Sequence, residues 1–226
     1  MKEFALCFLA HGDEHIEEFN KTCDKILSTY PHLNIFVLTN DKSKIHNDSI
    51  NIFEKKEDFN FNFKRYIIAE AFELYDTIIM LDTDIDIKSF EQIKTHINSD
   101  GMYVNWIASR LKHRGKLLNI GNDEYCNRLR KLNNHKYPVQ FIPEFCVFLK
   151  ITDIKTRKEF IERWGYIHNS VCDVEPTDRH LNLNGAVEGC IMYSACKDIG
   201  LPIFVSTKLF ESVKHYASIK SKKILI

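Results

Sequence analysis

Three short apolar runs, separated by polar or helix-like segments, most constrain the fold of this chain. They are Phe4–Ala10, Asn34–Thr39 and Thr77–Leu81. Continuous apolar runs of this length are typical of strands that are buried on both faces of a parallel sheet. Between the first two runs, apolar residues recur at helical spacing from Asp13 to Tyr30, and Pro31 stops the pattern. This β-α-β opening predicts parallel strands joined by a right-handed crossover.

Further elements follow the same α/β alternation. Four further stretches have patterns typical of helices, and three more are short runs typical of strands. We expect helices over 64–75, 90–98, from Asp153 to about Trp164 and over Gly185–Asp198, with strands at Ile50–Phe53, Phe145–Ile151 and Ile203–Ser206. The patterns within 102–140 are mixed and do not order that region. A chain of 226 residues suits a single α/β domain spanning 1–226.

Charge and cysteine usage exclude several classes of protein. The net charge is zero, with 31 acidic and 31 basic residues, so the whole surface is not built for nucleic acid. Basic residues do cluster in 108–136 and near the C-terminus, which fits either solvated faces or an anionic partner such as a nucleotide diphosphate or DNA. Seven cysteines without a C-x-x-C motif indicate reduced thiols in a cytoplasmic protein. No apolar run approaches the ~20 residues of a membrane span.

Acidic residues crowd the end of the third apolar run, where the sequence reads Asp82-Thr83-Asp84-Ile85-Asp86. In open α/β sheets, ligands bind beyond the carboxyl ends of the strands. Carboxylates gathered there repel one another unless a positive charge compensates. Their hard oxygen atoms suit Mg²⁺ or Mn²⁺, which keep open positions for substrate phosphates. The alternative is an acidic turn that caps a helix near Phe90.

The segment 61–87 carries a family resemblance. It reads F-N-F-K-R-Y-I-I-A-E-A-F-E-L-Y-D-T-I-I-M-L-D-T-D-I-D-I. This order of a basic and aromatic helix, a hydrophobic strand and L-D-x-D resembles the metal-site segment of GT-A fold glycosyltransferases. It is most similar to family 8, the retaining enzymes that include glycogenin and the lipopolysaccharide galactosyltransferases. The resemblance covers about two-thirds of the chain, and L-D-T-D is its specific part.

A second motif of that family lies near the C-terminus. The family pattern H-F/Y-x-G-x-x-K is matched by His215-Tyr216, but Ser218 replaces the glycine, and Lys220 and Lys222 flank the expected lysine position. The resemblance implies that His215 is the third protein ligand of the metal. The departure at Ser218 affects the lysine and the retaining stereochemistry more than the histidine.

The resemblance implies a role for each matching residue. Asp84 binds the metal, Asp82 reaches the metal and the ribose, and Thr83 lies between them in the DxD motif. The metal stabilises the leaving diphosphate, and Lys220 or Lys222 adds positive charge. Residues 1–100 then form the nucleotide-sugar and metal half, and residues 101–226 the acceptor half. The residues expected at the nucleotide or its sugar are Ala10, His11, Gly12, Thr39, Asp41 and Lys64.

The acceptor side is less specified by sequence. Glu188 lies where related enzymes often carry an acidic residue beneath the donor sugar, and a carboxylate there stabilises an oxocarbenium-like state or acts as a base. A glutamate on a helix surface is the alternative for this position. Asp178 and Glu144 are weaker candidates. Trp106 and Trp164 fit either sugar stacking or core packing.

Three other functions compete with a glycosyltransferase acting on a saccharide or a modified DNA base. A haloacid-dehalogenase-like phosphatase uses the first Asp of a D-x-D, here Asp82, as nucleophile, but that motif usually opens its domain. A nucleotidyltransferase usually has a glycine-rich basic loop after its first strand, where this chain has His11-Gly12-Asp13. A non-catalytic nucleotide- or glycan-binding module keeps the fold without turnover. The leading prediction is a metal-dependent transferase of the UDP-sugar type.

Overall fold

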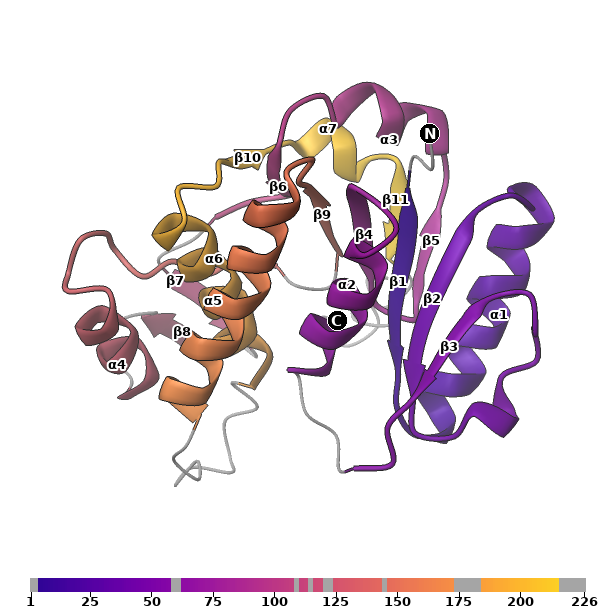
Figure 1. Ribbon diagram of the computed structural model, residues 1–226, viewed down its shortest axis with the longest axis horizontal. Coiled ribbons are helices and arrows are strands. Elements are labelled where there is room, and N and C mark those ends of the chain that lie inside the picture. The colour runs from indigo at the N-terminus through magenta and orange to yellow at the C-terminus, as the bar shows by residue number, and fades with distance from the viewer. Residues whose placement is uncertain are drawn as a thin grey trace.

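A seven-stranded sheet forms the centre of the computed structural model (Figure 1). The structure describes residues 4–57, 62–107, 110–113, 116–119, 124–143, 146–172 and 184–215. In spatial order the strands of the sheet are β10 (Ile203–Val205), β6 (Gly101–Val104), β9 (Cys146–Lys150), β4 (Thr77–Leu81), β1 (Ala5–Ala10), β2 (Asn34–Thr39) and β3 (Asn51–Glu54). Only β9 runs against its neighbours. The expected α/β architecture, with a mostly parallel sheet flanked by helices, is confirmed.

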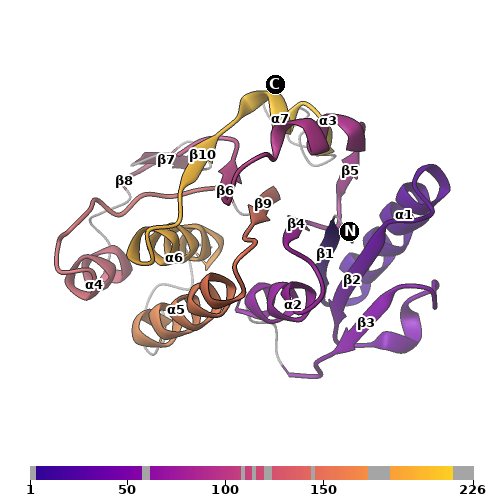
Figure 2. The same ribbon diagram turned by 45° about the horizontal axis from the view of Figure 1, so that its top comes forward.

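Two helical layers cover the sheet (Figure 2). One core cluster lies against α2, α4, α5 and α6, and the other against α1, α3 and α7. Along β1, β2, β4, β6 and β9, buried residues alternate between the two clusters, as the twofold repeat of a strand requires. The helices are α1 (Asp13–Thr29), α2 (Phe63–Phe72), α3 (Phe90–His96), α4 (Glu124–Leu132), α5 (Ile154–Cys172), α6 (Asn184–Asp198) and α7 (Thr207–Phe210), with a 3-10 turn η1 (Lys42–Lys44).

The apolar runs became strands because both of their faces are covered. All six residues of β1 are buried, which accounts for its unbroken apolar sequence. Helix α1 buries Ile16, Phe19, Cys23 and Ile26 at the spacing expected from the sequence and ends before Tyr30-Pro31. Strands β2 and β4 have the predicted bounds.

Several elements differ from the sequence-based expectation. Helix α5 continues to Cys172 rather than ending near Trp164, because Trp164 and Ile167 remain inside the core. Two small antiparallel ribbons were not predicted: β5 (Ile85–Ile87) with β11 (Val213–His215), and β7 (Arg110–His113) with β8 (Lys116–Asn119). Three- and four-residue strands carry too little periodicity to be recognised in a sequence.

No helix within the described residues is long and apolar enough to cross a membrane. The five cysteines whose side chains are described are free thiols in the protein interior. Burial raises the pKa of the Cys7 thiol far above its ordinary value. These five therefore act as small apolar core residues, as expected for reduced thiols.

Candidate functional site

The carboxyl ends of β1, β2 and β4 meet at one edge of the sheet. These strands are parallel neighbours, with Phe8 opposite Leu81 and Ala10 opposite Thr39. The loops that follow them begin at His11, Asn40 and Asp82, so the predicted nucleotide-binding and metal-binding segments share this edge. In open α/β sheets this is the edge at which ligands bind.

Asp82 is a partly exposed member of the acidic turn. Its side chain is 39% exposed, and its Oδ1 accepts a hydrogen bond from the ammonium of Lys64 at 3.1 Å. The Lys64 side chain is only 6% exposed. A buried ammonium needs a counter-ion, so helix α2 and the turn after β4 are tied together by this ion pair. The buried cation also offsets the charge that two neighbouring aspartates would otherwise concentrate there.

Thr83 and Asp86 are directed towards helix α1 instead. The Thr83 hydroxyl donates to Glu18 Oε2 at 3.1 Å, and the Thr83 carbonyl accepts from the Thr22 hydroxyl at 2.6 Å. Asp86 is buried and paired with Lys25. These contacts anchor the turn to α1 and separate Asp86 from the two acids of the DxD motif.

The β5–β11 ribbon brings the C-terminal histidine to this turn. Its register places His215 opposite Ile85, the residue that follows Asp84. Backbone bonds from Lys88 and Ser89 to the Ser212 carbonyl extend the contact. Directly opposed residues of an antiparallel pair have Cα atoms about 4.5–5.5 Å apart. The backbones of two sequence-predicted metal ligands, Asp84 and His215, are therefore neighbours, although they come from distant parts of the chain.

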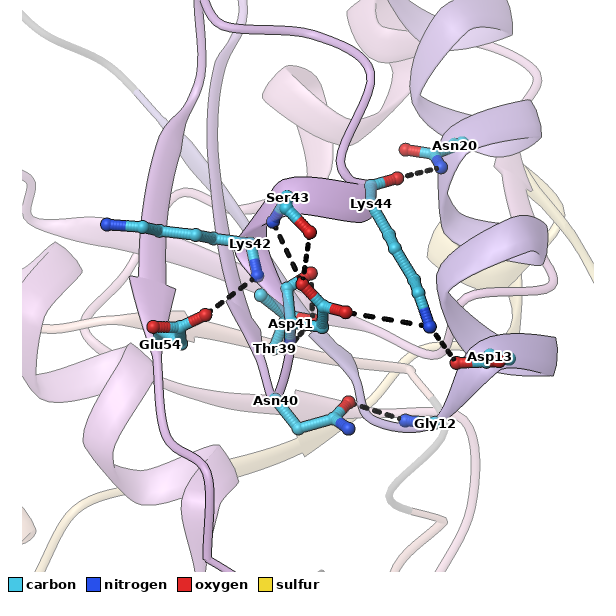
Figure 3. Close-up of polar contacts among 10 residues, drawn as sticks. All are labelled: Gly12, Asp13, Asn20, Thr39, Asn40, Asp41, Lys42, Ser43, Lys44 and Glu54. Atoms are coloured by element: carbon cyan, nitrogen blue, oxygen red, sulfur yellow. Dashed lines mark hydrogen bonds and ion pairs between the residues drawn. The ribbon is translucent and has the colours of Figure 1, made fainter.

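The loops after β1 and β2 are held together by polar contacts (Figure 3). The Gly12 amide donates to Asn40 Oδ1 at 2.7 Å, and Gly12 has a φ of 88°, which favours glycine. Asp41 caps η1, accepting from the Ser43 amide at 3.1 Å and the Ser43 hydroxyl at 2.6 Å. These bonds, the hydroxyl first, lower the pKa of Asp41. Asn40 was not among the predicted site residues, although an Asn after a strand signals such a turn.

The remaining nucleotide-side candidates differ in exposure. Ala10 and Thr39 are fully buried, and the Thr39 hydroxyl accepts from the Asp41 amide at 3.2 Å. His11 is partly exposed, and its Nε2 lies 3.0 Å from the Glu57 carbonyl oxygen. Of these three, only the His11 side chain is accessible to a ligand in the present conformation.

Glu188 lies inside the helical layer. It is 1% exposed, so the alternative of a helix-surface glutamate is wrong. Its Oε1 accepts from the Trp164 indole at 2.8 Å, and its Oε2 lies 3.9 Å from His168 Nδ1. Burial raises the pKa of Glu188 to about 7, against the opposing charges of Lys64 and Arg65 and the Trp164 hydrogen bond. Such a carboxyl exchanges its proton near neutral pH, as acid-base groups do.

The two tryptophans pack in or against the core. Trp164 is 0% exposed and stacks edge-on against Phe160. Trp106 is partly buried against Phe141, with ring centroids 5.4 Å apart. Trp164 is therefore a core residue that donates to Glu188, whereas Trp106 lies nearer the surface.

Several predicted site residues fall outside the described part of the chain. They are Asp178, Lys220, Lys222 and Glu144, together with the side chains of His215 and of most of the basic segment 108–136. Within the described side chains, no group of three His, Cys, Asp or Glu residues could hold a metal ion. The described part of the predicted metal site therefore consists of Asp82 and Asp84.

Two surface cavities lie away from this edge. One, of about 490 Å³, is at the opposite ends of β1 and β2 and is lined by residues such as Phe4, Leu33 and Phe90. The other, of about 200 Å³, lies between α2 and α5. Neither contacts the acidic turn.

Comparisons with known proteins identify similar folds. No protein-family model matches the sequence, and no curated protein matches it either. Among solved structures, the chain is similar to the galactosyltransferase LgtC in complex with donor and acceptor sugar analogs, with 12% identity and a TM-score of 0.47 over 84% of this chain and 69% of that one.

Two further structures have comparable similarity. The glycosyltransferase GlyE of Streptococcus pneumoniae TIGR4 is 14% identical, with a TM-score of 0.48 over 90% of this chain and 45% of that one. The bifunctional IspDF of Campylobacter jejuni is 13% identical, with a TM-score of 0.45 over 90% of this chain and 49% of that one. The chain thus spans about half the length of these two proteins, and the similarity concerns the arrangement of strands and helices.

Proposed function

We propose that this chain is a glycosyltransferase that uses Mn²⁺ or Mg²⁺ to move a sugar from a nucleotide-sugar to a hydroxyl group of a saccharide acceptor. Uridine diphosphate is the expected leaving group and retention the expected stereochemistry, both by resemblance to the family 8 enzymes. Asp82, Asp84 and His215 are the proposed metal ligands.

The observation that carries this proposal is the pairing of β5 with β11. The sequence resemblance names an L-D-x-D motif and a distant His-Tyr pair as parts of one metal site. In the structure, His215 lies opposite Ile85 in the ribbon that continues from Asp84. An acidic turn that only capped helix α3 would not need this partner, because Ser89 already caps that helix through a bond to the Gln92 amide.

The residues at this turn fit a divalent cation. Carboxylate oxygens and an imidazole nitrogen suit Mn²⁺, and carboxylates suit Mg²⁺. Asp82 is partly exposed and Asp84 is intermediate in burial, so both are accessible at the ligand-binding edge. When bound, the metal would neutralise charge on the departing diphosphate.

The chain's own residues supply the remaining functions. Lys64 orients Asp82 and brings a buried positive charge to the edge where the phosphates would bind. Glu188 holds a proton that is exchangeable near pH 7, and Trp164 and His168 orient its two oxygens. We assign Glu188 as the carboxyl of the donor-sugar side, with Asp178 as a second candidate. His11, Gly12 and the loop of Asp41 are assigned to the nucleoside.

The test compares two aspartates that lie two residues apart. Thermal stabilisation by Mn²⁺ and Mn²⁺-dependent hydrolysis are measured with a panel of nucleotide-sugars. Asp84→Asn is expected to stay folded and lose both responses. Asp86→Asn is the matched control, since Asp86 pairs with Lys25 on the α1 side, and it should retain them.

The outcomes separate this function from its competitors. Equal responses in the wild type and Asp84→Asn would contradict the proposed metal site. Release of phosphate from a phosphomonoester that is lost in Asp82→Asn would favour a phosphatase. Donor binding with neither transfer nor hydrolysis would favour a binding module.

The acceptor is tested separately. Transfer to saccharides is the first expectation. If the basic segment 108–136 instead contacts a modified DNA base, DNA binding should weaken steeply with added salt, because each neutralised phosphate releases counterions. Binding to DNA that does not depend on salt would exclude that acceptor.

A further inference from the structure

The outer face of helix α5 carries a regular row of exposed side chains. Ile154, Lys158, Glu162 and Tyr166 follow one another at intervals of four residues, and all four are exposed. Ile154 is 64% exposed and Tyr166 53% exposed, so the ridge presents two large apolar side chains to solvent. Residues four apart in a helix form a continuous ridge. Along the ridge, the four side chains are therefore apolar, basic, acidic and apolar in turn.

A groove runs beside this ridge. Helices α2 and α5 lie side by side (Figures 1 and 2), and a cavity of about 200 Å³ lies between them. Its lining consists of Ala69, Phe72, Glu73, Ile154, Arg157, Lys158, Ile161 and Glu162. Arg157 is already used within the chain, because it donates to the carbonyls of Ile151 at 2.6 Å and Phe72 at 2.8 Å. The groove has an apolar floor and a rim with charges of both signs.

The two rim charges on the ridge, Lys158 and Glu162, form no ion pair within the described part of the chain, although they are four residues apart. By contrast, Lys155 and Glu159, on the adjacent row, form an ion pair at 3.7 Å. Lys158 and Glu162 lie between the two apolar residues of the ridge, Ile154 and Tyr166.

We propose that this face is the interface of a symmetric dimer, in which α5 packs antiparallel against α5 of a second copy of this chain. A twofold axis that passes between Lys158 and Glu162 on the outer face of α5 places the ridge of one copy antiparallel to the ridge of the other. Lys158 then faces Glu162 of the partner subunit, and Ile154 faces Tyr166 of the partner subunit. The same two contacts recur on the other side of the axis, as an isologous interface requires.

The charge order selects a second copy over other occupants. A ridge with the order apolar, basic, acidic, apolar is complementary to itself when it is reversed. Rows of residues four apart interdigitate when two helices cross at about −50°, the commonest class of helix packing. The groove beside each ridge then receives apolar side chains of the partner's ridge.

The test measures the mass of the full-length chain by sedimentation equilibrium or light scattering over a range of concentrations. The wild type is expected to dimerise. Lys158→Glu places two acids opposite each other at both contacts, and Glu162→Lys places two bases there. Each variant is expected to dimerise about tenfold more weakly or worse, since like charges that face each other across an interface are costly. The double variant Lys158→Glu/Glu162→Lys should dimerise again.

Mixing the two single variants gives the sharpest test. A chain with two acids and a chain with two bases are complementary at both contacts, so the mixture should form a heterodimer although neither variant dimerises well alone. Lys21→Glu is the matched control, because Lys21 also lies on an exposed helix face with a glutamate four residues away, Glu17. It carries the same change of charge and the same repulsion within its helix, and it should leave the dimer intact.

Three results overturn the proposal. A wild type that stays monomeric up to roughly 0.5 mM excludes this dimer, whatever else the groove binds. A dimer that persists in both single variants lies on another surface. Single variants that are monomeric but fail to associate when mixed show that the charges do not face each other, provided that circular dichroism shows both to be folded.

Discussion

The buried carboxyl of Glu188 predicts a specific dependence of stability on pH. Burial raises the pKa of Glu188 from its ordinary 4.5 to about 7. Between these two values the folded chain holds the proton and the unfolded chain does not. The folded state therefore binds more protons, and stability falls as pH rises from about 4.5 to about 7. Above pH 7 the glutamate is ionised in both states, and its cost to stability is complete and constant.

The magnitude follows from the size of the shift. A shift of one pKa unit corresponds to about 1.4 kcal/mol, so the ionised Glu188 costs about 3 kcal/mol above pH 7. Glu188→Gln removes the ionisation and keeps an oxygen that accepts from the Trp164 indole. The variant should match the wild type within about 1 kcal/mol near pH 4.5 and be about 3 kcal/mol more stable near pH 8.

Denaturant unfolding at a series of pH values measures this difference. Among the described residues, the polar groups that interact with Glu188 include Lys64 and Arg65 from α2 and Trp164 and His168 from α5. They are present in both proteins, so their titration largely cancels when the two stabilities are subtracted. A difference that does not change between pH 4.5 and 8 would refute the argument, because it would mean that the Glu188 carboxyl has the same pKa in the folded and unfolded chain.

Two further predictions concern Lys64 and the glycine beside Glu188. Lys64→Met removes the positive charge 3.1 Å from Asp82, a charge that competes with a metal cation for this carboxylate. The variant should bind Mn²⁺ alone about tenfold more tightly in titration calorimetry. Weaker binding would contradict this competition. Gly189→Ala would place a Cβ 2.2 Å from the Ile142 carbonyl oxygen, and it should lower the free energy of unfolding by about 3 kcal/mol. Gly200→Ala is the control, because its Cβ meets no atom within 4 Å and only its φ of 72° is unfavourable; it should cost about 1 kcal/mol. Equal losses in chemical denaturation would rule out the close approach at Gly189.

Sequence patterns predict the parts of the site that are formed by residues close together in the chain. The acids at 82–86 follow a buried strand, and a strand of this kind must end at the edge of its sheet. His215 could be named only because a family resemblance points to it. Its proximity to Asp84 depends on pairing between two three-residue strands, and such strands have no periodicity of their own.

The burial of Glu188 could not be predicted from the residues next to it in the sequence. A glutamate in a helix of alternating small and apolar residues is compatible with a surface position or a buried one. Its burial depends on α5 supplying Trp164 and His168 as partners, and on α2 supplying a compensating charge. No sequence pattern relates these three helices, because their contact is set by packing on one face of the sheet.

The sequence by itself determined the α/β class, the bounds of β2 and β4 and the position of the acidic turn. The reason is that the spacing of apolar residues shows which face of a strand or helix is buried. Tertiary structure alone decided which acids stay at the ligand edge and which one turns to α1, where β11 pairs, and that Glu188 is buried. These outcomes depend on contacts between residues far apart in the chain, whose free energies appear only when the layers are packed together.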